Sequence, residues 1–174
     1  MKMTFSELCQ AFTTYTGAVD QVDNAQLALW FNEAQLDLAY DLGPVSTLEL
    51  EVGAGDCYRP GADWLCITGC ELFYQKLPDG RLRFPEGGRG AISFRALPSA
   101  FSGADGSAES SLPEPVHYLM AMFAASRYWD MESEGDGEES NHAGKWLSYY
   151  YQGKNAAKSR LPGASFDVTG WTVA

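Results

Sequence analysis

The chain has 174 residues, 45% of them hydrophobic and 13% aromatic, a composition typical of one globular domain. Its 12 basic and 23 acidic residues give a net charge of −11, which disfavours general binding to nucleic-acid phosphates because such binding depends on clustered lysine and arginine. No apolar run approaches the ~18 residues of a membrane span, and the N-terminus lacks the apolar segment of a signal peptide. We therefore expect a protein of the cytosol, or one assembled there, without membrane association and with reduced cysteines.

Two helices are predicted before residue 44. Residues 4–16 open with Thr-Phe-Ser-Glu, the pattern of a capping box, and continue with apolar residues at helical spacing. Residues 23–42 carry one apolar stripe, made of Leu27, Trp30, Phe31, Ala34 and Leu38. Gly43-Pro44 should end this second helix, as a C′ glycine followed by proline.

Between residues 46 and 96 the pattern changes to a period of two, which predicts a small antiparallel sheet of about five strands. Strands are expected at residues 47–52, 64–67, 70–74, 81–84 and 91–95. Pro78-Asp79-Gly80 is a strong turn signal, so the strand that follows it should close a hairpin.

Two more helices are predicted after a loop at 99–111, at about 115–134 and 138–159, the first opened by Pro115. The expected fold class is α+β: a four-helix bundle-like domain over residues 1–163, with the sheet inserted between the second and third helices. Residues 164–174 form an extended C-terminal tail in this prediction.

Common catalytic motifs are missing, and the sequence predicts no catalytic, cofactor-binding or metal site. The chain has no phosphate-binding glycine loop, no HExxH and no GxSxG. Cys57, Cys66 and Cys70 lack the paired spacing of a zinc site, which favours buried thiols. Residues 130–139 lack the closing glutamate of a calcium loop, which favours a solvated connection. His117 and His142, the only histidines, are expected at the surface or at helix ends.

Charged residues gather in three segments. Lys76, Arg81, Arg83, Arg89 and Arg95, against two acids, make residues 76–95 locally +3. Residues 130–139 carry six acids and no base: Asp130, Glu132, Glu134, Asp136, Glu138 and Glu139. Residues 145–160 carry four bases and no acid.

Each basic segment has two interpretations. Residues 76–95 form either a solvated hairpin face with protective edge charges, or a patch for an acidic partner or for passing DNA. The bases of 145–160 either complement the helix dipole or meet an acidic patch of a neighbouring subunit in a head-to-tail ring.

The C-terminal tail contains apolar side chains without a local partner, namely Phe166, Val168, Trp171 and Val173. A free terminus is usually polar and frayed, whereas interface energy concentrates in aromatic anchors. The tail therefore either folds back on its own domain or docks into another chain.

Three short motifs occur in a characteristic order: Leu29-Trp30-Phe31-Asn32-Glu33-Ala34 on the second helix, Tyr58-Arg59-Pro60 through Asp63 before a strand, and Leu112-Pro113-Glu114 opening a helix that ends Ala124-Ala125-Ser126-Arg127-Tyr128. In this order the chain resembles the head-to-tail adaptor (connector) proteins of DNA bacteriophages, over about residues 4–160. It departs from them at Arg59, where an apolar residue is usual, and at Gly61-Ala62, which lengthens the spacing between proline and aspartate.

The resemblance implies a structural role in the virion and no enzyme activity. Such proteins assemble in the host cytoplasm and form a ring, commonly twelvefold, beneath the portal in the neck between head and tail. The ring extends the DNA channel, lets DNA pass without sequence-specific binding, and is a platform for the next stopper or tail protein. The C-terminal segment commonly reaches into the portal, which would make Phe166, Val168, Trp171 and Val173 portal contacts. The charged residues of 76–95 and 130–139 would then lie between subunits or along the channel.

Two alternatives stay open at this point. One is a stopper or tail-completion protein of the same neck, for which a mainly β-barrel pattern is expected. The other is a cytosolic metal-dependent or small-molecule-binding enzyme that uses the cysteines of residues 57–70.

Overall fold

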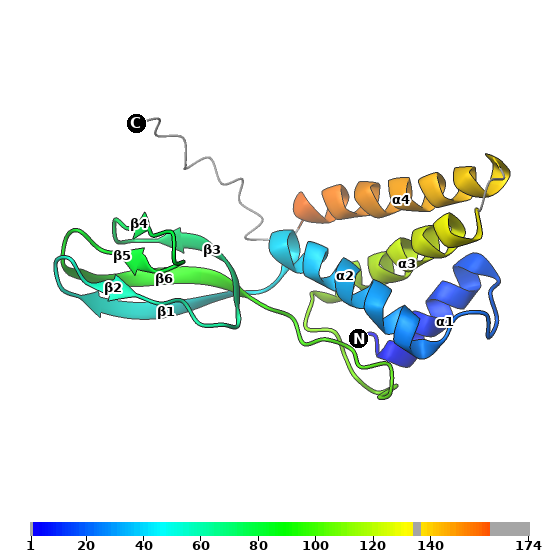
Figure 1. The fold of residues 1–174 in the computed structure, drawn as a ribbon, viewed down its shortest axis with the longest axis horizontal. Coiled ribbons are helices and arrows are strands. Elements are labelled where there is room, and N and C mark those ends of the chain that lie inside the picture. Colours follow the sequence, from blue (N-terminus) through cyan, green and yellow to red (C-terminus); the bar gives the residue numbers. More distant parts are fainter. Residues whose placement is uncertain (1, 134–136, 161–174) are drawn as a thin grey trace. The chain divides into compact units, whose positions relative to one another are not determined.

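A computed structural model describes residues 2–133 and 137–160, with the side chains of 137–140 excepted. These residues are α+β, with four α-helices and two small antiparallel sheets (Figure 1). They divide into two compact units. We call residues 2–43, 98–133 and 137–160 the helical unit, and residues 44–97 the β unit.

The first two helices begin and end where the local sequence dictates. The capping box is present at α1 (Phe5–Thr16), since Thr4 accepts the Glu7 N–H and the Glu7 carboxylate accepts the Thr4 N–H. Helix α2 (Asn24–Leu42) is capped by the Asp23 carboxylate, which accepts the Gln26 N–H.

The end of α2 differs from the left-handed glycine cap that was expected. Gly43 has φ −61° and ψ 155°, an extended conformation. Extended backbone is what Pro44 requires of the residue before it. Glycine is still needed there, because a Cβ at Gly43 would lie 2.6 Å from the Ala39 carbonyl oxygen.

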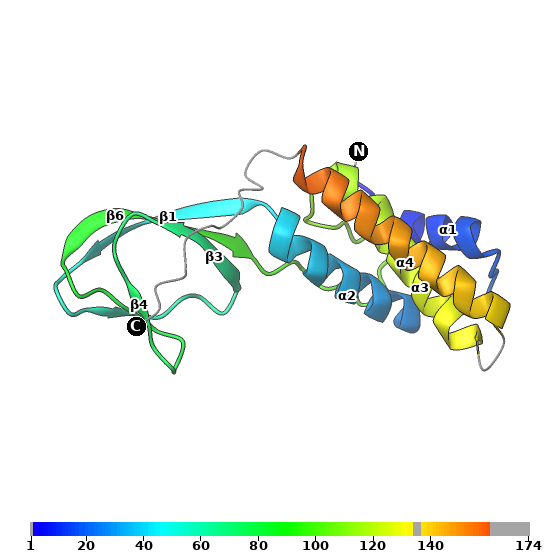
Figure 2. The ribbon, with the colours of Figure 1, turned by 90° about the horizontal axis from the view of Figure 1, so that it is seen from above.

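The later helices follow the predicted order. A 3-10 turn at Glu114–Val116 leads into α3 (His117–Glu132), and α4 spans Gly137–Lys158. Helix α3 packs against α1, α2 and α4 and buries residues along most of its length. Figure 2 shows α2 running beside α3 and α4. The close approach of α4 to α3 depends on Gly153, where a Cβ would lie 2.4 Å from Leu119 Cδ2.

The β unit holds two three-stranded antiparallel sheets in place of the single five-stranded sheet that was predicted. The larger has the order β1-β6-β3, with β1 at Val45–Val52, β6 at Gly88–Ala96 and β3 at Trp64–Cys70. The smaller has the order β2-β5-β4, with β2 at Cys57–Tyr58, β5 at Leu82–Arg83 and β4 at Gln75–Lys76.

One core is shared by the two sheets. It is built on Leu50, Leu82, Phe84 and Ile92, with partly buried apolar side chains around them. The strand predicted at residues 70–74 is wrong: only Cys70, the last residue of β3, is in a strand. The chain bends there because Leu72 folds over β6, where Gly88 and Gly90 leave room for it.

The cysteines are less buried than expected. Cys57 is exposed, and Cys9, Cys66 and Cys70 are half-buried. The interpretation of Cys57 as a buried thiol is therefore wrong, because β2 is a two-residue strand that turns this side chain to solvent.

Candidate interaction surfaces

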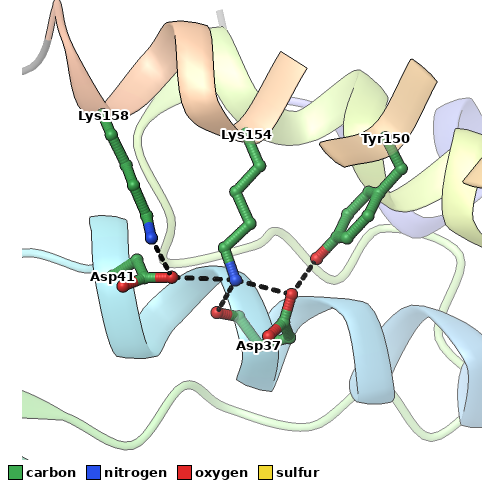
Figure 3. Close-up of polar contacts among 5 residues, drawn as sticks. All are labelled: Asp37, Asp41, Tyr150, Lys154 and Lys158. Carbon is green, nitrogen blue, oxygen red and sulfur yellow. Dashed lines mark hydrogen bonds and ion pairs between the residues drawn. The ribbon is translucent and has the colours of Figure 1, made fainter. Parts of the chain in front are cut away.

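An ion cluster joins α2 to α4 within the helical unit (Figure 3). The Lys154 ammonium lies 2.7 Å from an Asp37 carboxylate oxygen, 2.8 Å from an Asp41 carboxylate oxygen and 3.1 Å from the Asp37 carbonyl oxygen. Lys158 lies 2.7 Å from the same Asp41 oxygen. Tyr150 donates its hydroxyl proton to the Asp37 carboxylate.

Burial and charge oppose each other in this cluster. The Lys154 side chain is 8% exposed, and burial by itself lowers its pKa, but the hydrogen bonds and charges of Asp37 and Asp41 outweigh it and raise the pKa overall. For Asp41, burial raises the pKa, but the hydrogen bonds and charges of Lys154 and Lys158 have the larger combined effect and lower the pKa overall. Burial, followed by the hydrogen bond to Asp37, raises the pKa of Tyr150. Both shifts favour the charged forms of Lys154 and Asp41, and the raised pKa of Tyr150 favours its neutral, hydrogen-donating form.

This cluster is a third explanation for the bases of residues 145–160, and the sequence analysis missed it. Two of the four bases, Lys154 and Lys158, are paired within the chain. The signal was present as matched spacing, because Asp37 and Asp41 are four residues apart on one helix and the two lysines are four apart on another. Lys145 is exposed, with its ammonium 5.8 Å from the centre of the Tyr149 ring.

The five bases of residues 76–95 do not all lie on one surface. Lys76, Arg81, Arg83 and Arg89 are exposed, and Arg81 forms an ion pair with Asp79 at 2.6 Å. Arg95 is only 6% exposed, so it does not share their surface. Lys76 and Arg83 come from neighbouring strands of the small sheet, whereas Arg89 lies on β6 opposite Glu51 of β1.

The acidic run and the tail are only partly described. Asp130 and Glu132 are exposed at the end of α3. Glu134 and Asp136 lie outside the described residues, as do the side chains of Glu138 and Glu139. The proposed anchors Phe166, Val168, Trp171 and Val173 also lie outside the described residues.

The two histidines differ in their surroundings. His142 is exposed, as expected, on α4. His117 is at a helix end, the first residue of α3, which is one of its two expected positions; the surface position is wrong because the side chain is fully buried. Its Nδ1 accepts the Met3 N–H at 2.9 Å, which leaves Nε2 to donate to the Leu112 carbonyl at 2.8 Å. His117 therefore ties the N-terminus and the loop before α3 together.

The outer face of α2 carries three exposed apolar side chains beside the exposed Glu33, which the sequence analysis also missed. Leu29, Leu36 and Tyr40 are 62%, 44% and 59% exposed, and their spacing places them on one side of the helix. That side lies opposite the buried stripe that includes Phe31 and Leu38. A surface helix normally presents polar residues there, so an apolar outer face is typical of a surface that meets a partner.

The chain matches no protein-family model and no characterised protein with which it was compared. Among the described helices, none is long and apolar enough to cross a membrane. Within the same residues, no three His, Cys, Asp or Glu side chains are grouped so that they would hold a metal ion.

Proposed function

We propose that this chain is a structural protein of a bacteriophage neck, a ring-forming head-to-tail adaptor that docks on the portal. In this proposal the helical unit is the four-helix bundle-like body, the β unit is its insertion between α2 and α3, and residues 164–174 are the extended tail. The protein lies in the virion between head and tail, extends the DNA channel and receives the next stopper or tail protein. It has no catalytic role.

The observation that carries the proposal is the way the chain is divided. The helical unit is built from both ends of the described chain, and the β unit comes entirely from residues 44–97 between α2 and α3. Of the three motifs that resemble phage adaptors, the first lies on α2, the second lies before β3 and the third opens α3. This order favours an adaptor over a stopper, for which a mainly β-barrel pattern is expected.

The surfaces of the helical unit support a partner-bound state. Leu29, Leu36 and Tyr40 are apolar and exposed on α2. A ring of identical subunits provides a partner for such a face in every copy, whereas a monomer leaves it in water. The net charge of −11 per copy also suits a channel that surrounds DNA without gripping it.

Deletion of residues 164–174 tests the portal contact. We expect the truncated protein to keep its helical signal by circular dichroism and to lose binding to the portal ring of the same phage, measured by mass photometry of the mixed proteins. The physical reason is the loss of Phe166 and Trp171 as aromatic anchors. Replacement of Thr169 and Thr172 by serine, which keeps the anchors, is the matched control and should bind normally. Normal portal binding by the truncated chain would contradict the assigned role of the tail, and absence of portal binding by the full chain would contradict the adaptor function.

A further inference from the structure

Each of the two sheets of the β unit has two outer strands, and two of these four strands, β1 and β4, carry charged residues of opposite sign. β1 is the outermost strand of the larger sheet, and in the described residues it pairs only with β6. β4 is an outer strand of the smaller sheet, and among the described residues it pairs only with β5. Figure 1 and Figure 2 both show β1 and β4 at opposite sides of the β unit. Open strand edges present unpaired backbone N–H and C=O groups to any strand that approaches them.

The larger sheet has two edge strands, β1 and β3, and β1 is the longer and more regular of them. It matches β6 residue by residue over all eight positions from Val45 to Val52, without a bulge. The opposite edge, β3, is interrupted by two register shifts, between Trp64 and Cys66 and between Ile67 and Gly69. Bulges protect a sheet edge because they twist it away from incoming strands. β1 has no such protection, and only Leu50 of its eight residues is buried.

The charge of β1 selects its partner. Glu49 and Glu51 are exposed and project from the same face of the strand. In the described residues neither of them forms an ion pair, although Arg89 stands opposite Glu51 on β6. Two copies of β1 paired with each other would bring four carboxylates together on one face, which is unfavourable. A basic edge is therefore the complementary surface.

A base lies at an edge of the same unit. Lys76 on β4 is exposed and forms no ion pair within the described residues. Arg83 is exposed too, but it lies on the central strand β5 and pairs with Gln75, whereas Lys76 pairs with Leu82, so the two bases project from opposite faces of the sheet. Arg81, in the turn that leads into β5, is exposed as well and is paired with Asp79. The acidic edge and the basic edge cannot meet within one unit, because they lie on opposite sides of it.

We propose that the β units of two copies of this chain join head to tail, with the acidic β1 edge of one copy against the β4 edge of the next, where Lys76 lies. A contact between two different surfaces repeats from copy to copy and closes into a ring when the rotation allows it. Closure into a ring is the part of this inference that rests on the proposed function. The contact itself rests on the two open edges and their opposite charges.

Zero-length carbodiimide cross-linking tests the contact on the unmodified chain. The reagent joins a carboxylate to an amine that touches it, and Lys76 is the only lysine among residues 44–97. Equal amounts of ¹⁴N- and ¹⁵N-labelled full-length protein are mixed, cross-linked and digested. We expect peptides that join Glu49 or Glu51 to Lys76 with mixed isotopes, since mixed isotopes arise only between copies. A wild-type chain that stays monomeric at high concentration and forms no such mixed peptide overturns the inference.

Charge reversal provides the second measurement. The variants E49K/E51K and K76E should each weaken self-association by about tenfold or more in sedimentation velocity. The chain that carries all three changes should recover self-association, because each edge again meets its opposite. Glu86→Lys, exposed in the loop before β6, is the control and should associate as wild type. Unchanged association of both variants, or no recovery in the chain with all three changes, overturns the inference.

The two proposals fail in different experiments. If the wild-type chain binds the portal as a ring and both reversal variants form the same ring, the β-edge contact is wrong and the adaptor function stands. If the chain self-associates through these edges but does not bind the portal, the adaptor function is wrong and the contact stands.

Discussion

Replacing Lys154 by methionine tests whether the ion cluster holds α2 against α4. The change removes three contacts made by one ammonium group whose side chain is 8% exposed, and it leaves the carboxylates of Asp37 and Asp41 close together. Removing one partner of a buried ion pair costs about 3–5 kcal/mol. Here the Asp37 side chain is 46% exposed and Asp41 keeps Lys158, so water and that lysine offset part of the loss. We therefore expect the free energy of unfolding to fall by about 2 kcal/mol.

The measurement is urea unfolding followed by circular dichroism at 222 nm, because all four helices of the described chain belong to the helical unit. Lys145→Met is the matched control, since it removes the same charge from the same helix at an exposed position. It should change the free energy of unfolding by less than about 0.5 kcal/mol. Adding Asp37→Asn to Lys154→Met should recover part of the loss, because it removes one of the uncompensated charges. Equal stability of Lys154→Met and Lys145→Met would refute the reasoning.

The pH dependence of this effect follows from the shifted pKa values. The lowered pKa of Asp41 means that its contribution is present above the unfolded value of about 3.9 and is lost as the pH falls through the folded value. The raised pKa of Lys154 means that its contribution is present below about pH 10.4 and is lost as the pH rises through the folded value. The stability difference between wild type and Lys154→Met should therefore be flat between about pH 5 and 10 and shrink in stronger acid. A difference that changes steadily between pH 6 and 9 would contradict this assignment.

Two further predictions concern α4 and the acidic run. Gly153→Ala should lower the free energy of unfolding by about 1–2 kcal/mol, because the new Cβ overlaps the buried Leu119 side chain and outweighs the gain in helix propensity, whereas Gly144→Ala, which meets no neighbour, should raise it by about 0.5–1 kcal/mol. Thermal unfolding of both variants checks this, and a stabilised Gly153→Ala would show that the two helices separate at little cost. Replacing the six acids of residues 130–139 by their amides should change DNA retention or ejection in assembled virions, and unchanged retention and ejection would contradict a channel-facing position for this segment.

Helix positions were predictable because their signals are local. Thr4 and Glu7, which are three residues apart in the sequence, form a capping box, and the Asp23 side chain caps α2 through the N–H of Gln26, three residues on. The alternation of residues 47–52 predicted β1, since every second residue of a strand faces one side. The division of the β unit into two sheets was not predictable, because Leu72 folds over β6 only where Gly88 and Gly90 leave space for it.

The candidate surfaces, too, were predictable from the sequence only in part. The stripe of Leu29, Leu36 and Tyr40 has a periodicity that the sequence contains, but a helix that is apolar on two sides does not reveal which side faces its own core. His117 carried no sign of burial, because its two hydrogen-bond partners, Met3 and Leu112, reach it only through the packing of the N-terminus and the loop before α3.

The amino-acid sequence by itself determined the order of the helices, the change to a period of two at residues 46–96, the net charge of −11 and the local excess of acids and bases. Tertiary structure decided which of those charges remain available to a partner. Lys154 and Lys158 are paired with α2, and Arg95 is buried, whereas Lys76, Glu49 and Glu51 are exposed at sheet edges. The physical reason is that charge and periodicity belong to single residues and their near neighbours. Pairing and burial depend instead on segments that are far apart in the sequence; Asp37 and Lys154, for example, are 117 residues apart.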